Sequence, residues 1–104
     1  MFEITQSAAE QVLAAARQGG TEGMALRMAA RRKEDGTFDY LMGFDDVKEE
    51  DIRVNSRGVE IVMSPEYVPL LDETVMDFVE IEEGDQKFIF LNPKDANYSP
   101  AADA

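Results

Sequence analysis

Carboxylates are the only abundant side chains in this 104-residue sequence that could take part in chemistry, with 22 aspartates and glutamates in all. The chain contains no cysteine and no histidine. Without cysteine there can be no disulfide, thiolate nucleophile or cysteine-bound metal. Without histidine the commonest neutral metal ligand and the acid–base group that titrates near neutral pH are missing. These two absences exclude most classes of enzyme and of metal site.

Two acidic pairs, Asp72-Glu73 and Asp77 with Glu80, could perform general acid–base catalysis if burial raised the pKa of one carboxyl group. However, Asp72-Glu73 falls where a helix must turn into a strand, and Asp77 lies in an alternating strand pattern, as an exposed or capping residue would. A buried Asp77 bound to the backbone would be a structural carboxylate. We therefore predict that the protein is not an enzyme.

The stretch 45–51, DDVKEED, holds enough carboxylates to suggest a calcium loop. It lacks the glycine and the regular ligand spacing of an EF-hand. We therefore interpret it as a solvated connection.

The formal net charge is −12, with ten basic residues against the 22 acidic ones. Such a surface repels nucleic-acid backbones and anionic membranes, so the expected partners are proteins, basic ones above all. The basic cluster 31–33 has no interleaved aromatic residues, and we interpret it as the solvated flank of a turn instead of an RNA-binding patch. No signal-peptide pattern or membrane-spanning apolar run is visible, which predicts a cytoplasmic protein.

The elements that must position these groups can be read from hydrophobic periodicity. Ser7 and Glu10 have capping-box spacing, and small apolar residues then recur on one helical face until Gly19-Gly20. Two alternating runs, 24–31 and 38–44, flank Asp35-Gly36, a favoured hairpin turn if both of these residues take positive φ. The two runs should therefore pair in antiparallel fashion, and the stripe of Phe38, Tyr40, Met42 and Phe44 should be the core face of the second run.

Three further strands are expected at 59–63, 74–81 and 88–91, with a brief one at 52–54. Ser64-Pro65 predicts a short helix between the first two of the three. We predict an α+β fold with mostly antiparallel strands in two sheets, an N-terminal helix and one short internal helix. The domain should span residues 1–93, and residues 94–104, with almost nothing to bury, should form a mobile C-terminal tail.

Several short motifs, in this order and spacing, resemble the HesB/IscA family of A-type carriers in iron–sulfur cluster biogenesis. They are Ile4-Thr5 with 7–9, Leu26-Arg27, Tyr40, Phe44, Asp51-Ile52, Gly58-Val59, Leu71-Asp72, 77–79 and 88–93. The similarity runs from Ile4 to about Pro93. It implies a two-sheet β fold with flanking helices, non-enzymatic handling of iron or clusters, and often self-association.

The three cysteine ligands of that family are absent from this chain. The resemblance places Asp35 at the first ligand position and Ser99 and Ala101 at the other two. A [2Fe-2S] cluster needs thiolate or imidazole ligands, which these residues do not offer. We therefore expect no bound cofactor and no resident metal.

Cysteine loss and similar length resemble the DsrR-like members of the family, which implies an accessory or regulatory role in cytoplasmic dissimilatory sulfur oxidation. Candidate interaction surfaces are the hairpin tip 33–37 and the tail from Tyr98. We expect a monomer or a weak homo-oligomer that binds protein partners, with the sulfur-oxidation proteins as candidates. An alternative is a scaffold that binds iron through oxygen ligands such as Asp35, with Asp39 added across a dimer interface.

Overall fold

The computed structural model describes residues 1–96 and 98. Along the chain, the secondary-structure elements are β1 (Glu3–Ile4), α1 (Gln6–Gly19), β2 (Ala25–Arg32), β3 (Phe38–Asp45), β4 (Ile52–Ser56), β5 (Val59–Met63), the 3-10 turn η1 (Pro65–Tyr67), α2 (Val68–Leu71), β6 (Val75–Glu82) and β7 (Asp85–Leu91). The α+β class, the N-terminal helix and the short internal helix are as predicted.

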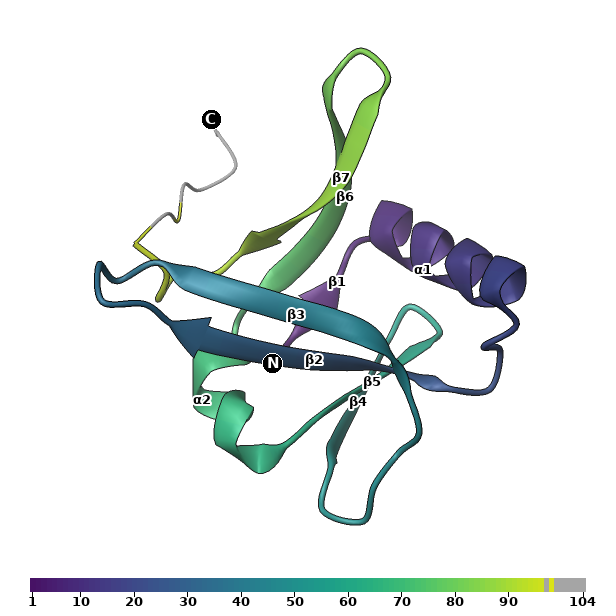
Figure 1. Cartoon of the computed structure of the whole chain (residues 1–104), viewed down its shortest axis with the longest axis horizontal. Helices are drawn as coiled ribbons and strands as arrows, with labels where there is room; N and C mark the ends of the chain where they lie inside the picture. The colour runs from purple at the N-terminus through teal and green to yellow at the C-terminus, as the bar shows by residue number, and fades with distance from the viewer. Residues whose placement is uncertain (97, 99–104) are drawn as a thin grey trace.

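The strands form two sheets, with orders β3-β2-β5-β4 and β1-β6-β7 (Figure 1). Both sheets are mixed, because β2 pairs with β5 in parallel and β1 pairs with β6 in parallel. The other three pairings are antiparallel, including the predicted hairpin of β2 and β3. The β6–β7 hairpin projects well beyond the rest of the molecule (Figure 1).

Helix α1 packs through the small-residue face that its periodicity predicts, with Ala8, Ala9, Val12 and Ala16 buried. Its N-cap is Thr5, whose hydroxyl oxygen accepts a hydrogen bond from the backbone N–H of Ala8 at 3.2 Å. The predicted cap at Ser7 is therefore wrong by two residues.

The turn between β2 and β3 also differs from the prediction. Only Gly36 takes a positive φ, of 87°, whereas Asp35 does not. The backbone N–H of Lys33 donates to the carbonyl of Thr37 at 2.7 Å, which closes a three-residue loop instead of a two-residue turn.

A single core lies between the sheets and the helices. Its largest fully buried apolar side chains come from the chain start, β2, β5, α2 and β6: Phe2, Met28, Ile61, Val62, Leu71 and Met76. The predicted core stripe on β3 is only partly buried, since Phe38 is enclosed but Met42 is 38% exposed. Phe88 and Phe90 lie at the margin, packed against the core.

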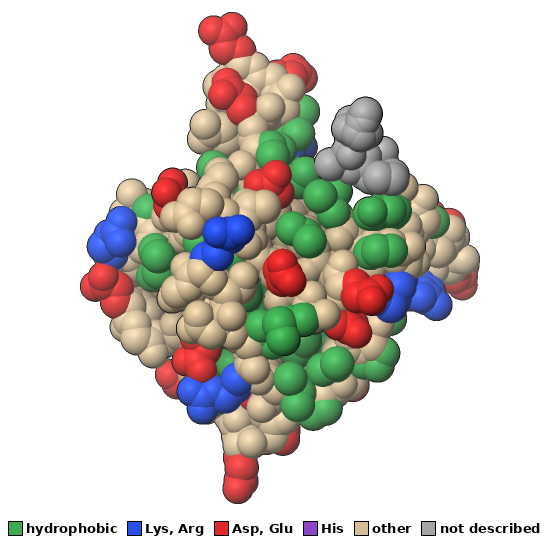
Figure 2. Space-filling model, turned by 180° about the vertical axis from the view of Figure 1, so that it is seen from behind, with side chains coloured by type: hydrophobic (Ala, Val, Ile, Leu, Met, Phe, Trp, Pro, Cys, Tyr) green, Lys and Arg blue, Asp and Glu red, His purple; other side chains and the backbone are tan. Residues whose placement is uncertain are grey.

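Acidic side chains occupy both projecting ends of the molecule (Figure 2). Hydrophobic side chains gather over part of the face seen in that view. Among the described residues, no helix has the length and apolar character needed to cross a membrane.

Candidate functional site

The first described residues of the predicted tail lie against the β2–β3 hairpin tip. The backbone N–H of Ala96 donates to the carbonyl of Gly36 at 3.0 Å. A Cβ at position 36 would lie 3.4 Å from the Cβ of Ala96, so glycine there serves both the positive φ and the close approach. The contact brings the segment after residue 93 to the loop that carries Asp35.

Asp95 holds this junction together and is only 6% exposed. Its carboxylate accepts a hydrogen bond from the backbone N–H of Phe38 at 3.2 Å and one from the hydroxyl of Tyr40 at 2.8 Å. Burial, followed by the hydrogen bond to Asp95, raises the pKa of Tyr40 well above its usual value, so the phenol keeps its proton. The prediction that the segment has almost nothing to bury overlooked this residue.

Asn92 sets the direction in which the chain leaves β7. Its side-chain amide donates to the carbonyl of Leu70 at 2.8 Å, and its side-chain oxygen accepts from the backbone N–H of Lys94 at 3.0 Å. The ring of Phe90 stacks on that of Tyr40 with 4.4 Å between centroids. These contacts join β3, β7 and the start of the tail into one unit.

Asp35 lies at the hairpin tip as an exposed residue. One carboxylate oxygen accepts from both the hydroxyl of Thr37, at 2.6 Å, and its backbone N–H, at 3.0 Å. These hydrogen bonds lower the pKa of Asp35, so its carboxylate is ionised at neutral pH.

Asp39 is engaged by basic side chains of its own hairpin. Asp39 forms ion pairs with Arg31 at 2.8 Å and with Lys33 at 3.5 Å, and the hydrogen bond from Arg31 lowers its pKa. Among residues 1–96 and 98, no three acidic side chains are grouped so that they could hold a metal ion. Ser99 and Ala101 lie outside the described residues, so their predicted positions stay predictions.

The basic cluster 31–33 is engaged within the protein. Besides the two ion pairs to Asp39, the guanidinium of Arg32 lies 5.2 Å from the ring centroid of Phe38. These contacts fit the interpretation of the cluster as a turn flank.

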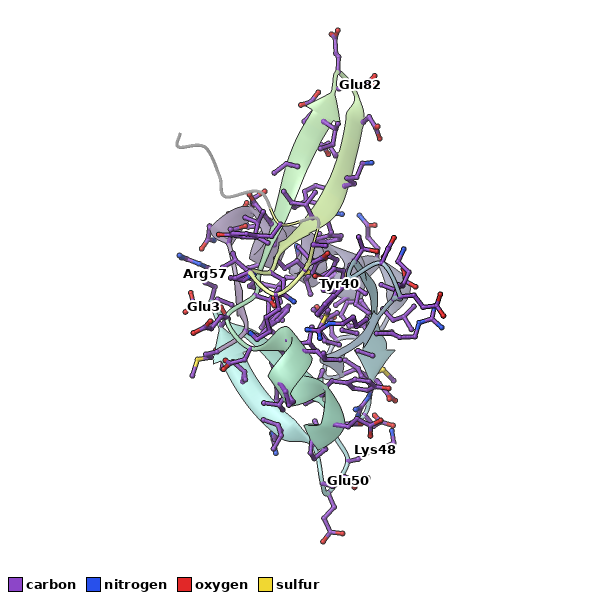
Figure 3. All side chains as sticks on the ribbon, turned by 90° about the vertical axis from the view of Figure 1, so that its left-hand side faces the viewer. Glu3, Tyr40, Lys48, Glu50, Arg57 and Glu82 are labelled. Carbon is purple, nitrogen blue, oxygen red and sulfur yellow. The ribbon has the colours of Figure 1, made fainter. Side chains whose placement is uncertain are left out.

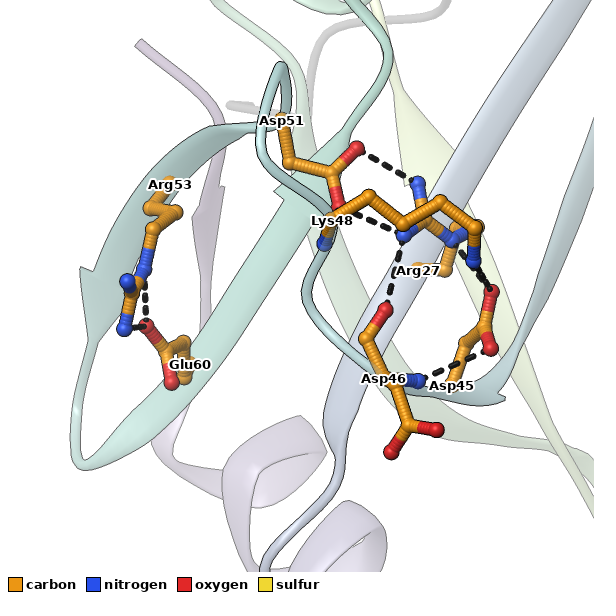
Figure 4. A network of polar contacts seen from close by, with 7 residues as sticks. All are labelled: Arg27, Asp45, Asp46, Lys48, Asp51, Arg53 and Glu60. Carbon is orange, nitrogen blue, oxygen red and sulfur yellow. Dashed lines mark hydrogen bonds and ion pairs between the residues drawn. The ribbon is translucent and has the colours of Figure 1, made fainter.

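The acidic stretch 45–51 is organised by Arg27 (Figure 4). Its guanidinium donates to Asp45 at 2.7 Å, to both carboxylate oxygens of Asp51 at 2.8 and 2.5 Å, and to the carbonyl of Asp46 at 3.0 Å. Two of the carboxylates that suggested a calcium loop are thus bound to an arginine.

The acidic pairs considered for catalysis have structural contacts. The Asp77 carboxylate accepts from the hydroxyl of Thr5 at 2.6 Å and from the backbone N–H of Phe78 at 2.8 Å. Asp72 pairs with the N-terminal ammonium group, which lowers its pKa. Asp77 therefore supports the cap of α1, as a structural carboxylate would.

Comparison with known proteins identifies the family. The chain is 32% identical over 97 residues to "Iron-binding protein IscA" of Yersinia pestis (strain Pestoides F), which covers 92% of this chain and 89% of that protein. The chain belongs to the HesB/IscA family. The corresponding protein of Yersinia pseudotuberculosis (strain YPIII) is also 32% identical to this chain over 97 residues. No family model matches the sequence.

Solved structures share the fold of this chain. The fold matches Escherichia coli SufA, "involved in biosynthesis of iron-sulfur clusters", with a TM-score of 0.75 and 23% identity over 99% of this chain and 90% of that one. It also matches IscA with a [2Fe-2S] cluster, with a TM-score of 0.69 and 24% identity over 89% and 83%. An Aquifex aeolicus protein solved by NMR is 30% identical, with a TM-score of 0.66 over 88% and 91%.

Proposed function

We propose that this family member is a non-enzymatic, A-type-carrier-like protein that does not carry a cluster and acts through protein contacts. The observation that carries the proposal is the hairpin–tail junction. Hydrogen bonds of Ala96 and Asp95 hold the two segments that bear ligands in the family, and the chain has no thiolate to offer there. The scaffold has thus kept its shape without the ligands, which favours a function located on its surface.

The role we propose is accessory or regulatory, in cytoplasmic dissimilatory sulfur oxidation. It rests on the likeness to DsrR-like family members, which share the loss of cysteine and a similar length. The expected partners are sulfur-oxidation proteins, and the net charge of −12 favours partners with basic surfaces. Strong self-association is not required, so a monomer or a weak homo-oligomer fits this role.

A second candidate function is a scaffold that binds iron through oxygen ligands. It is favoured by the exposed, ionised carboxylate of Asp35 at the family's first ligand position, and by the name of the Yersinia relative as an iron-binding protein. One carboxylate with a single unshared oxygen is a weak iron ligand, so a second chain would have to complete the site.

The deciding experiment is anaerobic reconstitution with ferrous iron and sulfide, followed by desalting, metal analysis and an absorption spectrum. The interaction role predicts no retained iron and no sulfide-to-iron absorption. Retained iron that is lost in Asp35→Ala but kept in the neighbouring control Glu34→Ala would overturn it in favour of the carboxylate scaffold.

The proposed pathway needs a separate test. Purified proteins of the dissimilatory sulfite reductase system should bind the immobilised chain, with an affinity that falls as salt screens the acidic surface. Absence of binding to all of them at low salt would contradict the role in sulfur oxidation.

A further inference from the structure

Strand β3 is an edge of the four-stranded sheet, because β2 is its only partner among the described strands (Figure 1). The bond from the Lys33 N–H to the Thr37 carbonyl marks residues 33 and 37 as a hydrogen-bonded pair. Hydrogen-bonded pairs alternate along an antiparallel ladder. The backbone groups of Asp39, Leu41 and Gly43 therefore face β2, and those of Tyr40, Met42 and Phe44 face away from it.

Asp95 covers one end of this outer edge. By the same alternation the N–H of Phe38 should point away from β2. It does so, because it donates to the Asp95 carboxylate at 3.2 Å, and this contact supports the assignment of the outward-facing groups. In the described part of the chain, no hydrogen bond reaches the N–H groups of Tyr40, Met42 or Phe44 from outside the sheet. Unpaired strand edges are usually shielded by charge, proline or a bulge. None of these occurs between Tyr40 and Phe44.

The side chains along this edge leave room for a neighbour. Leu41 is 71% exposed, and Gly43 has open space where a side chain would stand. A hollow of about 260 Å³ lies beside this edge, on the face of the β2–β3 pair, where Ala29, Leu41 and Gly43 line it together with Arg27 and Asp45. The edge thus combines free backbone groups with an apolar surface.

The end of β3 at Asp45 leads into an acidic loop. Arg27 binds Asp45 and Asp51, whereas the carboxylates of Asp46, Glu49 and Glu50 form no ion pair among the described contacts. All three residues are exposed, and Figure 3 shows Glu50 pointing away from the body of the molecule. Three unpaired negative charges therefore lie beyond the C-terminal end of the free edge.

We propose that the outer edge of β3, from Tyr40 to Phe44, binds an extended segment of a partner protein that adds a strand to the sheet. The segment runs antiparallel, the more stable pairing, so its N-terminal end lies at the acidic loop. It carries basic residues at that end, which pair with Asp46, Glu49 and Glu50, followed by alternating apolar residues over Leu41 and Gly43. This inference rests on the proposed interaction role and names the surface that performs it.

A second copy of the chain fits this edge less well than a basic segment does. Each copy has a net charge of −12, so two copies repel each other as they approach, although antiparallel pairing of two β3 strands would keep their acidic loops at opposite ends of the pair. Like charges disfavour such an association, whereas a basic segment is attracted.

The probe is a nine-residue peptide, Lys-Arg-Lys followed by three Val-Thr repeats, added to the full-length ¹⁵N-labelled protein. Binding should slow the solvent exchange of the N–H groups of Met42 and Phe44. A peptide starting Glu-Asp-Glu, and one N-methylated at alternate residues, should both bind at least about tenfold more weakly, since they lose the charge match and the backbone ladder.

Two protein variants form a matched pair. Met42→Pro removes one outward N–H that the fold itself does not use, and it should weaken binding about tenfold. Met42→Ala keeps this N–H and should stay within about twofold. If Met42→Pro does not fold, the N-methylated peptide still decides the question with the unchanged protein.

Unchanged exchange at Met42 and Phe44 at peptide saturation, or protection of another edge such as β4, would overturn the proposal. If the N–H groups of Met42 and Phe44 were protected from solvent exchange without peptide, and the protein were a dimer, the edge would belong to a second copy. That result would also overturn the proposal. Continued binding of sulfur-oxidation proteins in either case would show that only the surface is wrong, and not the interaction role.

Discussion

Arg27 is the residue on which the longest loop of the sheet depends. It bridges β2 to both ends of the 45–51 stretch, and the Asp51 oxygen that it contacts also accepts from the backbone N–H of Lys48 at 2.7 Å. The Asp51 side chain is only 1% exposed, so the pair is shielded from salt more than surface pairs are. A single arginine therefore fixes a segment that carries five acidic residues.

Replacing Asp51 with asparagine should lower stability at neutral pH and change its dependence on pH. The hydrogen bonds from Arg27 lower the pKa of Asp51 to about 2, below the value of about 3.9 for an unfolded aspartate. The ionised Asp51 carboxylate therefore makes its full contribution to the free energy of unfolding above about pH 4, and this contribution is lost as pH falls toward about 2. Urea denaturation should show a difference between wild type and Asp51→Asn that shrinks over this window.

The matched control is Asp46→Asn, because the Asp46 carboxylate forms no ion pair in the described structure while its carbonyl still accepts from Arg27. Its stability should stay close to that of the wild type at every pH. An Asp51→Asn difference that persists unchanged down to pH 2 would mean that packing, and not charge, accounts for the effect.

Among the elements, α1 shows how tertiary contacts override a local sequence signal. Ser7 and Glu10 have capping-box spacing, yet the helix begins at Gln6 and Ser7 donates to the carbonyl of Phe78 at 2.9 Å. The parallel pairing of β1 with β6 fixes Thr5 next to Asp77, and Thr5 becomes the cap. A cap that depends on a strand about 70 residues away is not visible in a local window.

Thr5→Ala should reduce the free energy of unfolding by about 1–2 kcal/mol, since it removes the N-cap and the hydroxyl that donates to Asp77. Ser7→Ala removes one exposed hydrogen bond and should cost at most about 0.5 kcal/mol. Urea denaturation of both variants gives the comparison. A larger loss for Ser7→Ala than for Thr5→Ala would restore the capping box as the true helix start.

Periodicity predicted the strands well where apolar residues alternate against a buried face. The strand predicted at 59–63 has the same bounds as β5, and the strand predicted at 52–54 is β4, which extends two residues further. The parallel pairings could not be predicted, because alternation defines the face of a strand and not its neighbour. Asp95 escaped notice because a short polar segment after Asn92-Pro93 carries no periodic signal, and its partners lie 55 and 57 residues away.

The proposed site was also predicted only in part from the sequence. The family resemblance led to Asp35 and the tail, and the structure brings the beginning of the tail to that hairpin through Ala96. The free edge of β3 was read from sequence as a core stripe, because alternation alone cannot distinguish an inner strand from an edge strand whose core face is only half covered. Edge position is a property of the whole sheet.

At the scale of the whole molecule, negative charge is concentrated at two projecting ends, one at Glu82 and the other at Glu50 (Figure 3). Charges of like sign crowd together at each end: Glu82, Glu83 and Asp85 at the β6–β7 tip, and Asp46, Glu49 and Glu50 in the acidic loop. Self-repulsion of this kind opposes the compact state without affecting which fold forms.

Sodium chloride should therefore stabilise the protein against urea. Screening shortens the Debye length from about 30 Å at 0.01 M salt to about 8 Å at 0.15 M, which weakens repulsion within each acidic end. The partly buried contact of Arg27 with Asp51 is screened less than this repulsion, so the net effect of salt should be an upward shift of the denaturation midpoint. Neutralising one end with Glu82→Gln and Glu83→Gln should reduce that shift. If the urea midpoint fell as salt was added, the ion pairs would stabilise the protein by more than the repulsion among its excess negative charges destabilises it.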